Sequence, residues 1–489
     1  MSDTIELLKN ITKAADNLSR QEAAIKEGTT QEIILPKGMS KKNAIRHLQH
    51  VMEEEATRMD VRYTFEAWPL EGAYGMHKVL KARYGYAVSE PKKMQSFFGT
   101  SEVAPEIRRI QTGPGLHDYE QVIWGQFAIP NITGGTFETK MIQEDNNVKF
   151  LLVGNIPAGQ RAEIDEVAQE LREWLKENSI YKGKSITVRT NEDGGLDPNH
   201  PPEFLDVSKA HAEDLILPKH SAEIVQALIL GPIENADTCR GFGITLNRGS
   251  LLHGSYGTGK TLCAMVAANK ANQNGWTFFY VDNPKNMLTI SKLARRYEPA
   301  VVFCEDVDQF LDNRDEKANE IINELDGLTS KGCEVMTIMT TNHLDRINPA
   351  VLRQGRMDLI LEFPAPDSET VERLVRKYAG DDLEPTEDIT EVGQILQGRI
   401  PASIAECVRR AKLVNITNKC TSTIDAESLK IAANSLEEHL RLLEPKEELS
   451  AEEQDVETIV RNVTTAFASL AGRKTHEIIT APITGDTRD

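Results

Sequence analysis

The sequence predicts an α/β domain with a parallel sheet, which an α+β region precedes and a small helical region follows. From about residue 215 onward, short apolar segments alternate with helical ones, as the strands and crossover helices of a parallel sheet do. The clearest strand patterns are residues 276–281, 300–304 and 335–341, which are rich in apolar, aromatic and β-branched side chains. Beyond residue 367 the pattern turns helical through about residue 443.

The 489 residues are too many for one ordinary core, so we expect several domains. Apolar side chains recur near helical spacing between residues 5 and 25, which predicts an amphipathic helix. Residues 191–202 are polar and rich in turn-forming residues, which is typical of a linker. The predicted division is an amphipathic helix at 1–29, an α+β adaptor or substrate domain at 30–190, a linker at 191–214, an α/β domain at 215–370, a helical lid at 371–445 and an acidic, polar tail at 446–489.

Charge and composition exclude several classes of protein. The formal net charge of −19 argues against non-specific binding to nucleic acid, whose phosphates repel an acidic protein. No apolar run approaches the ~20 residues that a membrane-spanning helix needs. The amino terminus lacks the basic start and apolar stretch of a secretory signal, and the six cysteines form no C-x-x-C pair. We therefore expect a cytoplasmic protein with reduced thiols and no membrane partner, and a nucleic-acid partner is not favoured.

A glycine-rich motif carries the clearest chemistry in the chain. Residues 254–261 read Gly-Ser-Tyr-Gly-Thr-Gly-Lys-Thr, the G-x-x-x-x-G-K-[ST] pattern of a phosphate-binding P-loop, between an apolar strand and a helix-forming segment. The glycines let backbone N–H groups converge on a phosphate, while Lys260 is placed to neutralise phosphate oxygens and Thr261 to complete a Mg²⁺ shell. The motif predicts a nucleoside triphosphate site, with the contacting residues Gly254, Ser255, Tyr256, Gly257, Thr258, Gly259, Lys260, Thr261 and Leu262.

Polar residues follow later strands at positions that suit phosphate cleavage. Glu305 and Asp306 end a buried strand, where one carboxylate can hold Mg²⁺ and the other can deprotonate the attacking water. We assign the base to Asp306 and the Mg²⁺ contact to Glu305; the reverse assignment stays open, as does a structure in which one acid only caps a loop. Asn342 ends a further strand, from which its amide can contact the γ-phosphate and the lytic water. Arg353 and Arg356 present guanidinium groups of the kind that stabilises a transferring phosphoryl group.

The order of these elements resembles the AAA ATPase module over roughly residues 215–440. The longest shared signature is the run 340–358, Thr-Thr-Asn-His-Leu-Asp-Arg-Ile-Asn-Pro-Ala-Val-Leu-Arg-Gln-Gly-Arg-Met-Asp, which resembles the second region of homology of that family. Within the family, residues 305–308 and 340–346 are most similar to the mitochondrial translocase group that moves the Rieske protein.

The resemblance implies ATP and Mg²⁺ as cofactors and a role for each matching residue. Glu305 and Asp306 form the Walker B pair, in the reverse of the usual Asp-then-Glu order, and Asn342 is sensor 1. Arg353 and Arg356 are arginine fingers that reach the ATP of the next subunit, which implies a ring, typically a hexamer. The segment that begins at Gly398 takes the sensor 2 position.

We therefore expect a ring-forming, Mg²⁺-dependent ATPase that remodels a protein partner held by the N-terminal domain. Threading members of the family carry an aromatic–hydrophobic–glycine loop after the second strand, and residues 282–299 contain no aromatic–glycine pair.

Two alternative functions stay open. One is a DNA-processing ATPase similar to clamp loaders or helicase loaders, which the acidic balance disfavours and DNA-stimulated turnover would indicate. The other is a nucleotide-binding scaffold that does not hydrolyse ATP, which the inverted acids allow.

Overall fold

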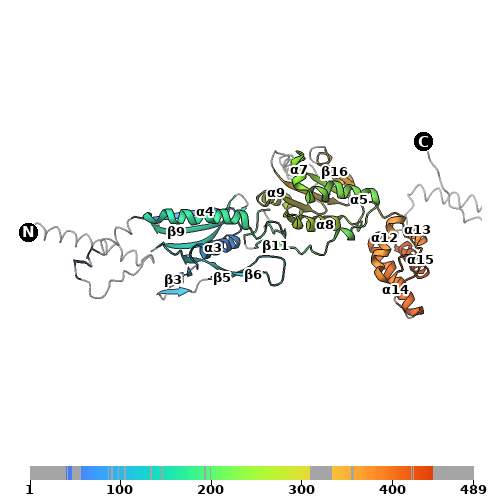
Figure 1. Cartoon of the computed structure of the whole chain (residues 1–489), viewed down its shortest axis with the longest axis horizontal. Helices are drawn as coiled ribbons and strands as arrows, with labels where there is room; N and C mark the ends of the chain where they lie inside the picture. Colours follow the sequence, from blue (N-terminus) through green and yellow to red (C-terminus); the bar gives the residue numbers. More distant parts are fainter. Residues whose placement is uncertain are drawn as a thin grey trace, which may run out of the picture.

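The computed structural model describes most of the chain between residues 57 and 443 (Figure 1). The described residues are 40, 42–43, 45–46, 57–85, 88–89, 92–96, 99–103, 106–132, 135–144, 147–191, 194–198, 200–308, 333–353, 357–419, 421 and 423–443. The predicted helix at 1–29, the tail at 446–489 and Arg356 lie outside these residues. None of the helices in the described part combines the length and the apolarity that crossing a bilayer requires.

An antiparallel sheet with two helices forms the first part of the structure, in the left half of Figure 1. In spatial order its described strands are β1 (Arg58–Phe65), β9 (Asn147–Pro157), β8 (Thr136–Glu144), β7 (Gln126–Ala128) and β2 (Val88–Ser89). Two further hairpins are β3 (Lys92–Ser96) with β4 (Gly99–Val103), and β5 (Glu106–Gln111) with β6 (Tyr119–Trp124). The helices are α3 (Pro69–Tyr84) and α4 (Arg161–Asn178). Helix α4 buries Ile164, Val167 and Leu171 at helical spacing, so this region is the α+β domain that the sequence predicted.

A mostly parallel, seven-stranded sheet follows in the described residues, in the middle of Figure 1. In spatial order its strands are β11 (Glu203–Phe204), β10 (Ser185–Thr187), β13 (Thr277–Val281), β14 (Ala300–Cys304), β15 (Val335–Thr341), β12 (Gly249–His253) and β16 (Leu359–Glu362). Neighbouring strands run parallel except β10 and β11. Every residue of β14 and β15 is buried, which explains why their sequences do not alternate with charged residues. The α/β prediction is confirmed.

Helices and helical turns accompany this sheet along the chain. The α-helices are α5 (Lys219–Val225), α6 (Gly231–Glu234), α7 (Ala236–Gly241), α8 (Lys260–Gln273) and α9 (Met287–Ala294), with a π-helical turn η3 (Gln226–Leu230) after α5. Short 3-10 turns are η1 (Ala158–Gln160), η2 (Ala212–Asp214), η4 (Pro284–Asn286), η5 (Arg295–Tyr297), η6 (Leu344–Arg346) and η7 (Gly380–Asp382).

Strand β10 belongs to the second sheet, although the sequence pattern placed residues 185–188 in the N-terminal α+β domain. It pairs in parallel with β13, and β11, which lies in the predicted linker, pairs with β10. One buried apolar cluster joins Phe65 of β1, Ile186 of β10 and Tyr297 of η5. A strand of three residues carries no periodicity that identifies its neighbour, so the sequence did not reveal that the two sheets share a core. The exact division into domains stays a prediction.

The helical lid is confirmed at the end of the described chain, on the right of Figure 1. Its helices are α12 (Ser368–Ala379), α13 (Thr390–Ile395), α14 (Pro401–Lys419) and α15 (Ala426–Leu443). Asp367 caps α12, because its Oδ1 accepts a hydrogen bond from the Thr370 N–H at 2.8 Å. The lid has a core of its own, and it also contacts the segment before α5 through an ion pair of 2.6 Å between Lys377 and Asp214.

Candidate active site

The predicted phosphate loop connects β12 to α8, as the motif requires. Gly254 lies so close to the backbone of Phe363 that a Cβ atom at this position would be 2.3 Å from the Phe363 carbonyl oxygen. Gly259 has a φ of 101°, which side chains disfavour, and it precedes the first residue of α8. Lys260 and Thr261 therefore occupy the first two positions of α8, where the helix dipole favours a bound anion.

The ammonium group of Lys260 lies in a polar network at the base of this loop. It donates hydrogen bonds to the carbonyl oxygens of Gly254 (2.7 Å) and Ser255 (2.8 Å) and to Oδ1 of Asn342 (2.8 Å). Burial lowers the pKa of Lys260, whereas three nearby carboxylates oppose that shift. Lys260 therefore contacts both the predicted phosphate loop and Asn342, the predicted sensor residue, which lie far apart in the sequence.

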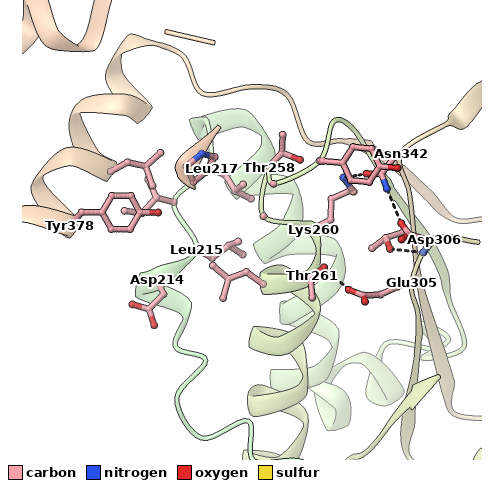
Figure 2. A pocket seen from close by; sticks show the side chains of 18 residues that line it. Asp214, Leu215, Leu217, Thr258, Lys260, Thr261, Glu305, Asp306, Asn342 and Tyr378 are labelled. Atoms are coloured by element: carbon pink, nitrogen blue, oxygen red, sulfur yellow. Dashed lines mark hydrogen bonds between the residues drawn. The ribbon is translucent and has the colours of Figure 1, made fainter. Parts of the chain in front are cut away.

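Both carboxylate oxygens of Glu305, the residue after β14, accept hydrogen bonds. Oε1 accepts from the hydroxyl of Thr261, as Figure 2 shows, and Oε2 accepts from the hydroxyl of Tyr280 at 2.9 Å. Thr261 and Glu305 therefore place a hydroxyl and a carboxylate side by side. These are hard oxygen donors of the kind that Mg²⁺ prefers, so the residues present fit the predicted ion.

Asp306 faces Asn342 instead (Figure 2). Its Oδ1 accepts from Nδ2 of Asn342 at 2.8 Å, and its N–H donates to Oγ1 of Thr340 at 3.3 Å. Its φ of 47° lies in the left-handed region, which few residues other than glycine adopt unless their surroundings fix them. Burial raises the pKa of Asp306, and the charges of Asp308 and Glu305 raise it further. A carboxylate with a raised pKa accepts a proton more readily, which is the property a general base needs.

These groups line one cavity of about 380 Å³, a volume within the ~300–1,000 Å³ that is common for small-molecule sites. Residues 256–262 of the predicted loop line the cavity together with Glu305, Asp306 and Asn342. Gly254 and Ser255 contribute instead the carbonyl oxygens that hold Lys260. The structure therefore brings the predicted phosphate-loop, acidic and sensor residues together.

The opposite wall of the cavity was missed by sequence reasoning. Besides Asp214, Leu215 and Leu217 before α5, it includes Tyr378 on α12 of the lid (Figure 2). This wall is largely apolar and includes an aromatic ring, which suits a flat heterocycle at the end away from Lys260. The apolar run 215–217, directly after the predicted linker, was a signal for part of this wall. Tyr378 had no local signal, because only the packing of the lid brings it to the cavity.

The predicted arginines are not part of this cavity in the described structure. Arg353 is exposed and does not line it, and Arg356 lies outside the described residues. In the segment that begins at Gly398, Arg399 donates to both carboxylate oxygens of Glu437, at 2.7 and 2.6 Å. An arginine that serves a neighbouring subunit need not reach the cavity of its own chain, so the assignment of fingers stays a prediction.

The fold and this site define a P-loop nucleotide-binding domain. Residues 250–365 match the family described as "ATPase family associated with various cellular activities (AAA)", so this part of the chain is similar to that family. A curated relative, "26S proteasome regulatory subunit 6A" of Schizosaccharomyces pombe (strain 972 / ATCC 24843), is 34% identical over 182 residues. That match covers 33% of this chain and 41% of the relative, so the chain spans about two fifths of the length of the curated relative it matches.

Proposed function

We propose that this chain is a Mg²⁺-dependent ATPase that forms a ring and uses ATP turnover to remodel a protein partner. The observation that carries the proposal is the continuous chain of contacts from Lys260 through Asn342 to Asp306 in one cavity. A cation for the phosphates and a carboxylate with a raised pKa thus lie on either side of one amide. A scaffold that only binds nucleotide does not need a carboxylate such as Asp306 beside the phosphate site.

Each residue has a defined part in the proposed hydrolysis. Lys260 neutralises the β- and γ-phosphate oxygens, and Asn342 orients the water that attacks the γ-phosphorus. Asp306 takes a proton from that water as the new P–O bond forms and the bond to the β–γ bridging oxygen breaks. Thr261 and Glu305 would hold Mg²⁺, which supplies positive charge for the phosphate oxygens when it is bound. The reverse assignment, with Glu305 as base, is disfavoured because both of its oxygens already accept hydrogen bonds.

We propose that the ring is a hexamer of this chain and that Arg353 and Arg356 complete the site of the next subunit. The exposure of Arg353 outside its own cavity supports this assignment. The printed name of the relative places that protein in an assembly, the 26S proteasome. The finer likeness to the Rieske translocase group is a proposal that rests on residues 305–308 and 340–346 alone.

We propose that the client is a protein bound by the N-terminal domain in the cytoplasm, without a nucleic-acid or membrane partner. The shared core between the two sheets, and an ion pair of 2.6 Å between Arg296 and Glu66, connect this domain to the ATPase sheet. The segment after β13 forms the short turn η4 and carries no aromatic–glycine pair. These features support remodelling through the N-terminal domain in preference to threading through a pore.

Steady-state phosphate release from Mg·ATP tests the proposal. We expect Lys260→Ala to lower turnover by about 100-fold or more, because it removes the cation of the site. Lys270→Ala is the matched control, since Lys270 lies on the same helix but pairs with Glu234 at 2.7 Å. Its turnover should match the parent. Equal turnover in the parent and in Lys260→Ala would overturn the proposal.

A further inference from the structure

Tyr280 is a residue whose contacts the proposed hydrolysis does not use. It lies on β13, one residue before the strand ends, and its hydroxyl donates to Oε2 of Glu305 at 2.9 Å. The parallel register places Tyr280 directly opposite Phe303, two residues before Glu305 on β14. Glu305 follows directly after β14, and its hydrogen bond with Tyr280 places the two side chains on the same side of the sheet.

The ring of Tyr280 is held firmly. It packs against the ring of Phe303, with centroids 5.7 Å apart and planes at 58°. The Tyr280 carbonyl oxygen accepts a hydrogen bond of 3.2 Å from the hydroxyl of Thr187 on β10, which fixes the backbone at the same position. A fixed ring presents its hydroxyl at a constant place, whereas a glutamate side chain that is free to rotate samples several rotamers.

We propose that Tyr280 is a positioning residue that holds the Glu305 carboxylate beside Thr261 and so determines how tightly the site binds a divalent cation. The proposal rests on the proposed function, because it concerns the same site. Tyr280 occupies Oε2, which leaves Oε1 directed at the Thr261 hydroxyl. The donor pair is therefore preformed, and the ordering of Glu305 does not have to accompany cation binding.

The hydrogen bond between Tyr280 and Glu305 also distinguishes the roles of Glu305 and Asp306. Glu305 is held by Thr261 and Tyr280, whereas Asp306 is held by Asn342. In this proposal Tyr280 keeps the Glu305 carboxylate in place to bind the cation, and Asp306 remains available to accept a proton from the attacking water. A tyrosine whose hydroxyl merely finds the nearest acceptor would have no effect on cation affinity.

The test is a titration with Mn²⁺, followed by electron paramagnetic resonance, of the full-length protein saturated with ADP. We expect Tyr280→Phe, which removes only the hydroxyl, to weaken Mn²⁺ binding roughly 10-fold. ADP affinity measured in EDTA should stay that of the parent. Tyr63→Phe is the matched control, because the Tyr63 hydroxyl donates to the Asp165 carboxylate at 2.5 Å in the N-terminal domain. It should leave Mn²⁺ binding unchanged.

A double-mutant cycle shows whether the effect passes through Glu305. In a Glu305→Gln background, Tyr280→Phe should cause no further loss of Mn²⁺ affinity. Unchanged Mn²⁺ affinity in Tyr280→Phe, an equal loss of ADP affinity in EDTA, or the full loss in the Glu305→Gln background would each overturn the inference while leaving the proposed function intact. A parent protein that binds neither ADP nor Mn²⁺·ADP would overturn both.

Discussion

The Nδ2 group of Asn342 donates a hydrogen bond of 2.8 Å to Oδ1 of Asp306. The other end of the same amide accepts from the ammonium of Lys260. Asn342 follows β15 and Asp306 follows β14, so one amide connects the ends of neighbouring strands to the start of α8. A shift of Lys260 toward a phosphate would therefore alter the hydrogen bond that Asn342 makes to Asp306, the carboxylate that we assign as base.

Asp306→Asn should bind ATP as the parent does and hydrolyse it at least about 100-fold more slowly. The amide keeps an acceptor oxygen for Asn342 but cannot accept a proton at neutral pH. ATP affinity by calorimetry and single-turnover hydrolysis measure the two effects separately. Asp345→Asn, an exposed position on η6, is the control. Undiminished turnover in Asp306→Asn would remove this residue from the role of base.

The rate of ATP hydrolysis should fall as the pH falls through the pKa of Asp306, because the protonated acid cannot act as a base. Burial and the charges of Asp308 and Glu305 raise that pKa, so the fall should begin at a higher pH than for an ordinary aspartate. In Asp308→Asn one repelling charge is gone, and the remaining oxygen can still accept from Thr341, a contact of 2.7 Å in the parent. The acidic limb of the pH–rate profile should then move to lower pH. A limb that stays in place or moves upward would contradict this electrostatic account.

Glu71 should make the folded protein less stable as the pH rises. This carboxyl is 1% exposed, and burial raises its pKa to about 7 from 4.5, although Ser179 and the Ile180 N–H donate to it. A raised pKa means that stability is fully present below the unfolded-state value and declines as the pH rises through about 7. The loss is on the order of 3 kcal/mol by pH 8. Urea unfolding at pH 5 and pH 8 should show this decline in the parent.

Glu71→Gln should remove most of that dependence, because the amide carries no charge at either pH. Glu106→Gln is the control, since Glu106 is largely exposed and pairs with Arg108 at 2.6 Å. It should keep the parent's difference between the two pH values. If Glu71→Gln keeps that difference as well, the buried carboxyl is not its source.

Subunits with Arg353→Ala and subunits with Lys260→Ala should each be inactive alone and regain turnover when mixed. An Arg353→Ala subunit keeps an intact phosphate loop, and a Lys260→Ala neighbour would supply its missing arginine. Mixing Arg353→Ala with a Lys260→Ala, Arg353→Ala double variant is the control, because every subunit then lacks Arg353. Phosphate release from the mixtures measures the outcome. Absence of recovery in the first mixture would argue against a site shared between subunits.

The parts of the site that were predicted from the sequence are those encoded by contiguous residues. The glycines and Lys260 follow a local pattern that needs only a strand before and a helix after it. The parallel sheet was equally visible, because β14 and β15 are buried along their whole length. The sheet to which β10 belongs and the site positions of Tyr280 and Tyr378 were not, because the partners of these residues lie far away in the sequence. Which carboxylate a tyrosine meets depends on strand order and register, and neither can be read from one chain's periodicity.

The buried cluster that joins Phe65, Ile186 and Tyr297 packs the N-terminal sheet directly against the strands beside the phosphates. Domains connected by a flexible tether can absorb a displacement by swivelling, but an apolar contact surface without water resists relative motion. Movement at the ends of the central strands would therefore turn the N-terminal sheet as a rigid lever. A protein bound to the N-terminal domain would then move with this sheet during each cycle of the proposed ATP hydrolysis.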